Sequence, residues 1–136
     1  QKQYHSSQFG LVIDEKEPLM VKCSKVLLKR VFENIVKNAR DNKATQLEIS
    51  ISKNKVLFID DGSGVTPEIL IKLRVGEPIS TKPEEGGVGL QFVRQTCREK
   101  GWQLKFDSVT NLRDFSKKGL AVQITFTPPQ NGQKSQ

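Results

Sequence analysis

Two glycine clusters, each followed by a predicted helix, contain the residues best suited to chemistry in this chain. The first, residues 60–64 (DDGSG), follows the apolar run 56–59, so a strand delivers Asp60 to its end, where glycines allow a turn that a side chain would block. The second, residues 86–89 (GGVG), directly precedes a helical pattern, where backbone N–H groups can face an anion. Together they predict a site that reads a base at one end and phosphates at the other.

A predicted helix carries a row of polar side chains. From Ser24, a suitable N-cap, apolar residues recur at helical spacing to about residue 42. Asn34, Asn38 and Asp41 fall at i, i+4 and i+7 on one face beside this apolar stripe. The row is either the wall of a site or a solvated ridge in which Lys37 pairs with a neighbouring acid, and the helix alone leaves both interpretations open.

The segment 74–87 has no hydrophobic period and is rich in glycine and proline, so it predicts a long loop. Such a loop inside a compact domain is typical of a lid over a ligand. Thr81 and Lys82 offer a hydroxyl and an ammonium group suited to phosphate oxygens, and solvated loop side chains are the alternative.

The remaining patterns predict a mixture of strands and helices. A hairpin is predicted from residues 9–13 and 19–21, and a central strand from the apolar run 56–59. Alternation of apolar and polar residues predicts further strands at 47–52, 102–106 and 122–126. Helices are predicted at 66–73 and 90–100. We expect one domain over 9–128, with residues 1–8 as a linker or disordered N-terminus and 129–136 as a tail. His5, the only histidine, then belongs to the solvated N-terminal segment.

Composition and charge limit the class of protein. Hydrophobic residues at 35% and charged residues at 27% are ordinary for a soluble protein, and no apolar run approaches the roughly 18 residues that a membrane span needs. We therefore expect a cytoplasmic segment, whose parent protein can still be anchored in the inner membrane elsewhere. The net charge of +7 favours acidic partners, which include nucleotides, nucleic acid and acidic protein surfaces. Cys23 and Cys97 lack metal spacing and are predicted to be reduced and buried.

The order of these motifs resembles that of the GHKL superfamily, which includes gyrase, the ninety-kilodalton heat-shock chaperones, histidine kinases and MutL proteins. The order is a helix with N-x-x-x-N, a strand that leads into D-x-G-x-G, a loop, and G-x-G-L at the start of a helix. The closest likeness, over residues 21–128, is to the catalytic domain of bacterial sensor histidine kinases. The resemblance implies an α/β (α+β) two-layer sandwich of the Bergerat type, in which three helices cover one face of a mixed, mainly antiparallel sheet. It also implies ATP and Mg²⁺ as ligands, bound between the helices and the lid.

The implied function is the ATP-binding domain of a two-component kinase, which positions Mg-ATP for phosphoryl transfer to a histidine in a separate dimerisation domain. A response regulator would be an indirect partner, and no contact with nucleic acid or membrane is expected. Asn38 matches the magnesium ligand, and Asp60 matches the carboxylate that accepts a hydrogen bond from the adenine amine. Asn34 matches a position that is a glutamate base in the ATPase branches; its amide cannot take a proton, which favours transfer over hydrolysis.

The predicted site follows from this matching. The catalytic residues are Asn34, Asn38 and Lys82, the metal ligand is Asn38, and the ATP-binding residues are Asn38, Asp41, Asp60, Gly62, Gly64, Thr81, Lys82, Gly87, Val88, Gly89 and Leu90. Departures from the family pattern are Glu85 for a glycine, Val88 for a leucine, acidic residues at 41 and 61, and no phenylalanine before the lid. The alternatives are an ATPase clamp of the MutL or gyrase kind and a non-catalytic protein-interaction module, with a nucleic-acid binder third.

Overall fold

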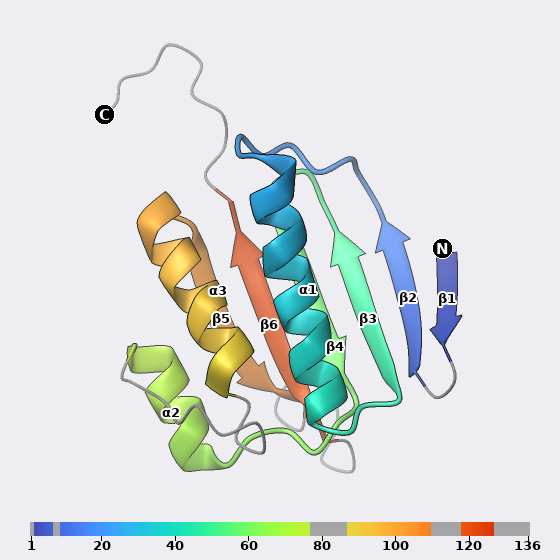
Figure 1. The fold of residues 1–136 in the computed structure, drawn as a ribbon, viewed down its shortest axis with the longest axis vertical. Helices are drawn as coiled ribbons and strands as arrows, with labels where there is room; N and C mark the ends of the chain where they lie inside the picture. The colour runs from blue at the N-terminus through green and yellow to red at the C-terminus, as the bar shows by residue number, and fades with distance from the viewer. Residues whose placement is uncertain (1, 7–8, 77–86, 110–117, 127–136) are drawn as a thin grey trace.

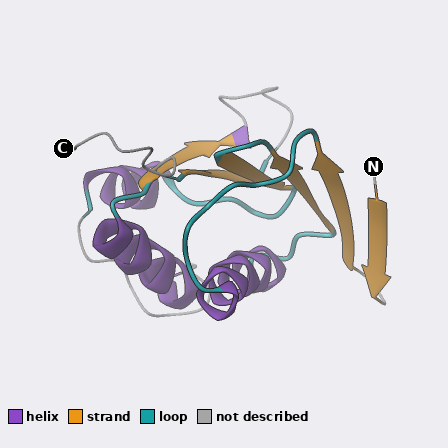
Figure 2. Ribbon diagram, turned by 90° about the horizontal axis from the view of Figure 1, so that it is seen from above, coloured by secondary structure: helices purple, strands orange, loops and turns teal. Residues whose placement is uncertain are grey.

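The structure, a computed structural model, describes residues 2–6, 9–76, 87–109 and 118–126, which form six strands and three helices (Figure 1). In chain order these are β1 (Lys2–Ser6), β2 (Phe9–Glu15), α1 (Lys25–Asp41), β3 (Gln46–Ile51), β4 (Lys55–Asp60), α2 (Pro67–Val75), α3 (Gly87–Lys100), β5 (Gln103–Ser108) and β6 (Leu120–Thr125). The strands make one sheet in the order β1-β2-β3-β4-β6-β5, in which only the β2–β3 pair is parallel. All three helices lie on one face of this sheet, as Figure 2 shows. The predicted fold class, a mixed and mainly antiparallel sheet under three helices, is confirmed.

The core lies between the sheet and the helices. β4 is central, as its continuous apolar run predicts, and its Val56 and Phe58 are 0% and 1% exposed. Phe58 meets Phe32 of α1 edge to face, with ring centroids 5.1 Å apart. Fully burying a side chain of this size contributes about 1.5–3 kcal/mol, so this row of contacts fixes how α1 lies over the central strands.

Helix α1 begins and ends where the sequence predicts. The Ser24 hydroxyl accepts a hydrogen bond from the backbone N–H of Leu27 at 3.0 Å, which satisfies one of the donors left free at a helix start. Asn42 is the C-cap residue. Helix α2 is capped in the same way by Thr66, and it continues two residues beyond the predicted end at Leu73, to a left-handed Gly76 with φ of 78°.

The N-terminal segment differs from the prediction. Residues 2–6, expected to belong to a linker, form β1 and pair antiparallel with β2, because their backbone groups complete the open edge of that strand. The predicted hairpin of 9–13 with 19–21 is wrong, since β2 lies between β1 and β3 instead. Pro18 directly precedes the second segment, where its missing N–H disfavours strand pairing, and the Met20 N–H donates to the Lys53 carbonyl at 2.6 Å.

The sheet face away from the helices carries a second, smaller apolar cluster. It consists of Ile59, Val109 and Ala121, with Leu57 packed against them. Cys97 is buried in the main core, where burial raises its thiol pKa to about 12, whereas Cys23 is only half-buried. Both cysteines are free, as predicted. Within the described ranges, none of the helices combines the length and apolar character that crossing a bilayer requires.

Candidate nucleotide site

Asp60 ends β4 as a buried carboxylate, only 6% exposed. Its Oδ1 accepts hydrogen bonds from the backbone N–H of Gly62 at 2.9 Å and of Leu120 at 3.2 Å. Burial raises the pKa of Asp60, the two backbone hydrogen bonds oppose that rise, and the charge of Asp61 adds to it. Among the described residues both bonds use Oδ1, so Oδ2 is left to accept a hydrogen bond from a ligand.

Asp61, the neighbouring carboxylate, is committed to the fold. Its two oxygens accept hydrogen bonds from the N–H and hydroxyl of Thr45 at 2.8 and 2.6 Å, and from the N–H of Gln46 at 3.0 Å. Burial raises its pKa, but these hydrogen bonds outweigh burial and the net pKa is lowered. Asp61 thus fastens the end of β4 to the start of β3 and holds the Asp60 turn in place.

Close backbone contacts at this turn leave no room for side chains. A Cβ on Gly62 would lie 2.5 Å from the carbonyl oxygen of Asn42, and a Cβ on Gly119 would overlap the carbonyl of Asp60. Gly64 has φ of 76°, which a side chain rarely adopts. The backbone of α1's end, the DDGSG turn and the start of β6 therefore meet directly around the Asp60 carboxylate.

Helix α1 brings its polar row to the same end of the sheet, but its three members differ. Asn38 is 4% exposed, and no hydrogen bond joins its amide to another described residue. Asn34 is half-buried and donates from Nδ2 to the Arg30 carbonyl at 2.7 Å, which leaves its Oδ1 as an acceptor. Asp41 is exposed and paired with Lys37 at 2.9 Å. The prediction of one polar face thus resolves into a buried amide, a half-buried amide and a surface ion pair.

The second glycine cluster meets this row. Helix α3 begins at Gly87, three residues before the predicted start, so the glycines form its first turn rather than precede it. A Cβ on Gly89 would lie 2.9 Å from the Asn34 carbonyl oxygen and 3.4 Å from its Oδ1. The N-terminus of α3, with its free N–H groups, therefore lies against the amide row of α1, which is an arrangement suited to phosphate oxygens.

Several predicted residues are placed only in part. Thr81 and Lys82 lie outside the described residues, as does Glu85, and Val88 is described by its backbone alone. Leu90 is 1% exposed and belongs to the core, so only its backbone is available to a ligand.

Four residues that contribute to the Asp60 turn were not predicted from the sequence: Asn42, Thr45, Gly119 and Leu120. Only Gly119, a glycine directly before an alternating strand, carries a recognisable sequence signal, because the other three act through backbone or long-range contacts.

The donor set fits an adenine nucleotide. The buried side-chain nitrogen of Asn42, Nδ2, has no hydrogen-bond partner in the described part of the chain. The backbone carbonyl of the same residue accepts a hydrogen bond from the Ser63 N–H at 2.8 Å, next to the Gly62 turn. Buried polar groups are otherwise almost always paired, so this corner has unused hydrogen-bonding capacity. For a magnesium ion the protein offers the Asn38 amide oxygen, and no group of three His, Cys, Asp or Glu gathers within the described ranges. Most ligands of such an ion would then be water and phosphate oxygens, as Mg²⁺ prefers.

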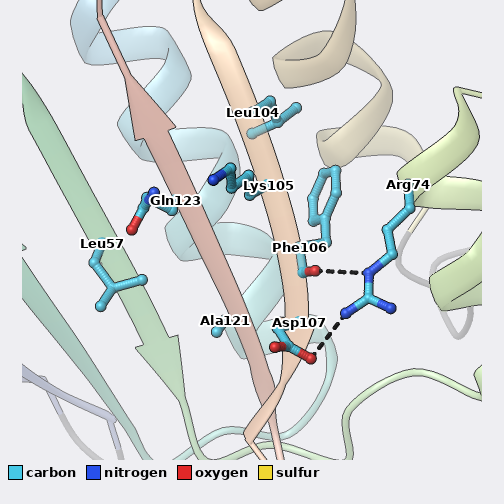
Figure 3. Close-up of a pocket in the computed structure, with 8 residues that line it drawn as sticks. All are labelled: Leu57, Arg74, Leu104, Lys105, Phe106, Asp107, Ala121 and Gln123. Atoms are coloured by element: carbon cyan, nitrogen blue, oxygen red, sulfur yellow. Dashed lines mark hydrogen bonds and ion pairs between the residues drawn. The ribbon is translucent and has the colours of Figure 1, made fainter. Parts of the chain in front are cut away.

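A separate hollow of about 520 Å³ lies elsewhere on the molecule. Figure 3 shows Leu57, Lys105 and Gln123 projecting from three adjacent strands, with Arg74 and Asp107 paired at its edge. These three residues alternate with core side chains such as Phe58 and Val122, so the hollow faces away from the helices. It is therefore distinct from the candidate nucleotide site.

Comparison with known proteins places this geometry in a family. Residues 23–131 match the family described as "Histidine kinase-, DNA gyrase B-, and HSP90-like ATPase". Sporulation kinase D of Bacillus subtilis (strain 168) is 27% identical over 117 residues, which cover 81% of this chain and 22% of that protein. The chain thus spans about a fifth of the length of that curated relative.

Solved structures share the fold. The mycobacterial sensor histidine kinase MprB aligns with a TM-score of 0.66 at 20% identity, over 88% of this chain and 84% of that chain. A nucleotide-free catalytic domain of histidine kinase ThkA aligns at 0.61 with 20% identity, over 85% and 78%. Full-length ShkA in complex with AMPPNP aligns at 0.61 with 16% identity, over 88% and 26%.

The agreement is therefore threefold, in the order of motifs, in the sheet and helix layers, and in the family match over most of the sequence. The resemblance to the GHKL superfamily is confirmed, and with it the expectation of ATP as the ligand. This chain belongs to the family of histidine kinase-, DNA gyrase B- and HSP90-like ATPases.

Proposed function

We propose that this chain is the catalytic domain of a two-component histidine kinase, which binds Mg-ATP and presents its γ-phosphoryl group to a histidine in a separate dimerisation domain. The observation that supports it best is the Asp60 carboxylate, buried to 6% exposure with one oxygen saturated by backbone N–H groups. A buried acceptor that is half satisfied selects a ligand with a donor at that position, as the exocyclic amine of adenine has and the guanine carbonyl lacks.

Each remaining residue then has a role along the nucleotide. Asn38 would hold the magnesium ion, which when bound neutralises charge on the phosphates. The first turn of α3, with Gly87 and Gly89, would bind phosphate oxygens through backbone N–H groups, and Thr81 and Lys82 are proposed to contact them from the loop. Chemistry would depend on positioning and charge neutralisation, because phosphoryl transfer needs little covalent work from the protein.

Transfer is favoured over hydrolysis by the surroundings of Asn34. Its Nδ2 is bonded to the Arg30 carbonyl at 2.7 Å, and an amide at this position cannot accept a proton from water. Glu33, the nearest acid on α1, has a side chain 62% exposed and lies 3.8 Å from Lys29 on the solvent side. Neither residue is placed to act as a general base, so an ATPase clamp is the weaker proposal.

Calorimetry and a transfer assay test the proposal. We expect the 136-residue chain to bind a nonhydrolysable ATP analogue more tightly with Mg²⁺ than without it, and to bind the GTP counterpart much more weakly. Mixed with ATP and the histidine-bearing domain of its parent protein, it should produce an acid-labile, base-stable phosphoprotein. Steady release of phosphate by this chain alone, with no transfer, would contradict the kinase assignment.

A further inference from the structure

Two arginines stand side by side on the outer face of α3, one helical turn apart. A Cβ on Gly76 would lie 3.8 Å from the Nη2 atoms of both Arg94 and Arg98, so the two guanidinium groups converge on one point at the end of α2. Together with Gln91 and Gln95 they line a small hollow of about 200 Å³. One carboxylate could therefore contact both groups at once.

Neither guanidinium group has an acidic partner within the described part of the chain. Glu99, the nearest acid along the helix, accepts a hydrogen bond from Gln95 Nε2 at 3.1 Å instead. Burial, followed by the charge of Arg98, lowers the pKa of Arg94. Like charges at i and i+4 destabilise a helix, so the pair costs the free protein some stability that a bound anion would return.

Exposed apolar side chains lie on α2, which ends at the Gly76 that the arginines approach. Ile71 and Val75 are 59% and 60% exposed and lie one turn apart, and Val75 immediately precedes the Gly76 that the arginines approach. Large exposed apolar residues next to a charged hollow are typical of a protein interface. In contrast, Arg74, on the same helix as Ile71 and Val75, is already paired with Asp107 at 2.9 Å.

We propose that Arg94 and Arg98, together with the exposed Val75 and Ile71 of α2, dock an acidic and apolar segment of the protein that receives the phosphoryl group. The inference rests on the proposed function for the identity of the partner but not for its chemistry. Arg94 follows Gly89 by about 8 Å along the axis of α3, so a partner held at the arginines would lie beside the phosphate end of the nucleotide site. The surface would then orient the acceptor and raise its encounter rate.

The first experiment is a titration of the chain with a hexaglutamate peptide at low salt, followed through the arginine Nε–H signals in NMR. We expect saturable shifts at Arg94 and Arg98 and little change at Arg74, and at least about tenfold weaker binding in Arg94→Glu/Arg98→Glu. The double variant Lys53→Glu/Lys55→Glu, at exposed positions in the β3–β4 turn and at the start of β4, changes the net charge equally and should bind as the wild type does. Hexaglutamine is the uncharged peptide control.

Equal weakening in both double variants, or no saturable binding by the wild type, would overturn the docking surface. Inorganic phosphate that binds the pair as tightly as the peptide would overturn the assignment to an acidic protein segment. Calorimetry with the ATP analogue on the same variants separates the two proposals, because Arg94→Glu/Arg98→Glu should leave nucleotide affinity unchanged. Wild-type chain that binds the peptide but no nucleotide would refute the proposed function and leave the acidic docking surface in place.

The identity of the partner is tested by transfer to the histidine-bearing domain at saturating ATP. The arginine double variant should raise the KM for this domain at least about tenfold while kcat at saturating acceptor changes little. An unchanged KM would overturn the assignment of the acceptor as the partner.

Discussion

Replacing Asp60 with asparagine exchanges one oxygen for a nitrogen in a site whose geometry dictates which one changes. Oδ1 accepts two backbone N–H bonds, from Gly62 and Leu120, and only an oxygen can keep both. The asparagine must therefore place its Nδ2 where Oδ2 was, so a donor faces the position assigned to the adenine amine. Asp60→Asn thus converts an acceptor into a donor at that point without changing volume.

The size of the effect follows from this reversal. A hydrogen bond to a charged group contributes about 1.5–3 kcal/mol, and leaving opposed donors without partners in a site only 6% exposed costs about a further 1–3 kcal/mol. The sum corresponds to ATP affinity weakened by roughly two to four orders of magnitude. An inosine nucleotide, which carries an oxygen in place of the amine, should lose much less or gain affinity, because the asparagine Nδ2 can donate to that oxygen.

Calorimetry with ATP and inosine triphosphate on both proteins measures this change of preference. Urea unfolding of both proteins at several pH values gives a second readout. Because the folded-state pKa of Asp60 is raised above 3.8, the wild type loses stability as pH rises through that pKa, and the asparagine variant does not. Asp60→Asn should therefore gain stability relative to wild type as pH increases from 3.8. Near-normal ATP affinity in the variant would refute the adenine assignment.

Other predictions concern the turn and the core. Gly62→Ala should lower the free energy of unfolding by roughly 1–3 kcal/mol and weaken nucleotide binding, because its Cβ would lie 2.5 Å from a backbone oxygen. Gly101→Ala, at a φ of 74° with nothing within 4 Å of the added Cβ, should lower it by about 1 kcal/mol and leave binding intact. Equal losses for the two variants in urea unfolding would contradict this. Asp61→Asn should be less stable than wild type near neutral pH, and the difference should shrink as pH falls below 3.8, because the lowered pKa stabilises the folded protein only while Asp61 is ionised. Phe126→Ala, at 0% exposure and stacked edge to face on Trp102, should lose about 3–5 kcal/mol in the same assay, and a loss below 1 kcal/mol would contradict the packing.

The sequence predicts most of the fold because its local signals agree with the long-range contacts. Helix α1 combines a serine cap, a helical apolar period and a clear end, and the structure places it within one residue of the prediction at each terminus. The central position of β4 follows from its unbroken apolar run, since a strand with apolar clusters on both faces lacks the alternating polar side chains of a strand with one wet face. These elements carry Asn34, Asn38 and Asp60, so the core of the candidate site was predictable.

The sequence fails where pairing depends on partners far along the chain. β1 has no apolar alternation of its own and forms because β2 offers it an open edge, while β2 itself pairs in parallel with β3, more than thirty residues later. The role of Asp61 was also hidden, because its three hydrogen bonds reach back to Thr45 and Gln46 across the sheet. The Leu120 N–H, which donates to Asp60 Oδ1, lies sixty residues further along the chain, and no local sequence pattern predicts this contact.

The two adjacent aspartates of this turn differ in what their charge does to the stability of the folded protein. Asp61 has a lowered pKa and three hydrogen bonds to its neighbouring strand, so its charge stabilises the fold. Asp60 has a raised pKa chiefly because it is buried, so its charge is a cost that the free protein bears and a ligand donor can reduce. Arg94 and Arg98 on α3 likewise have no acidic partner among the residues that the structure describes. In both places, groups without a full set of partners among the described residues are the ones that we propose recognise a ligand, an adenine ring at Asp60 and an acidic protein segment at the arginines.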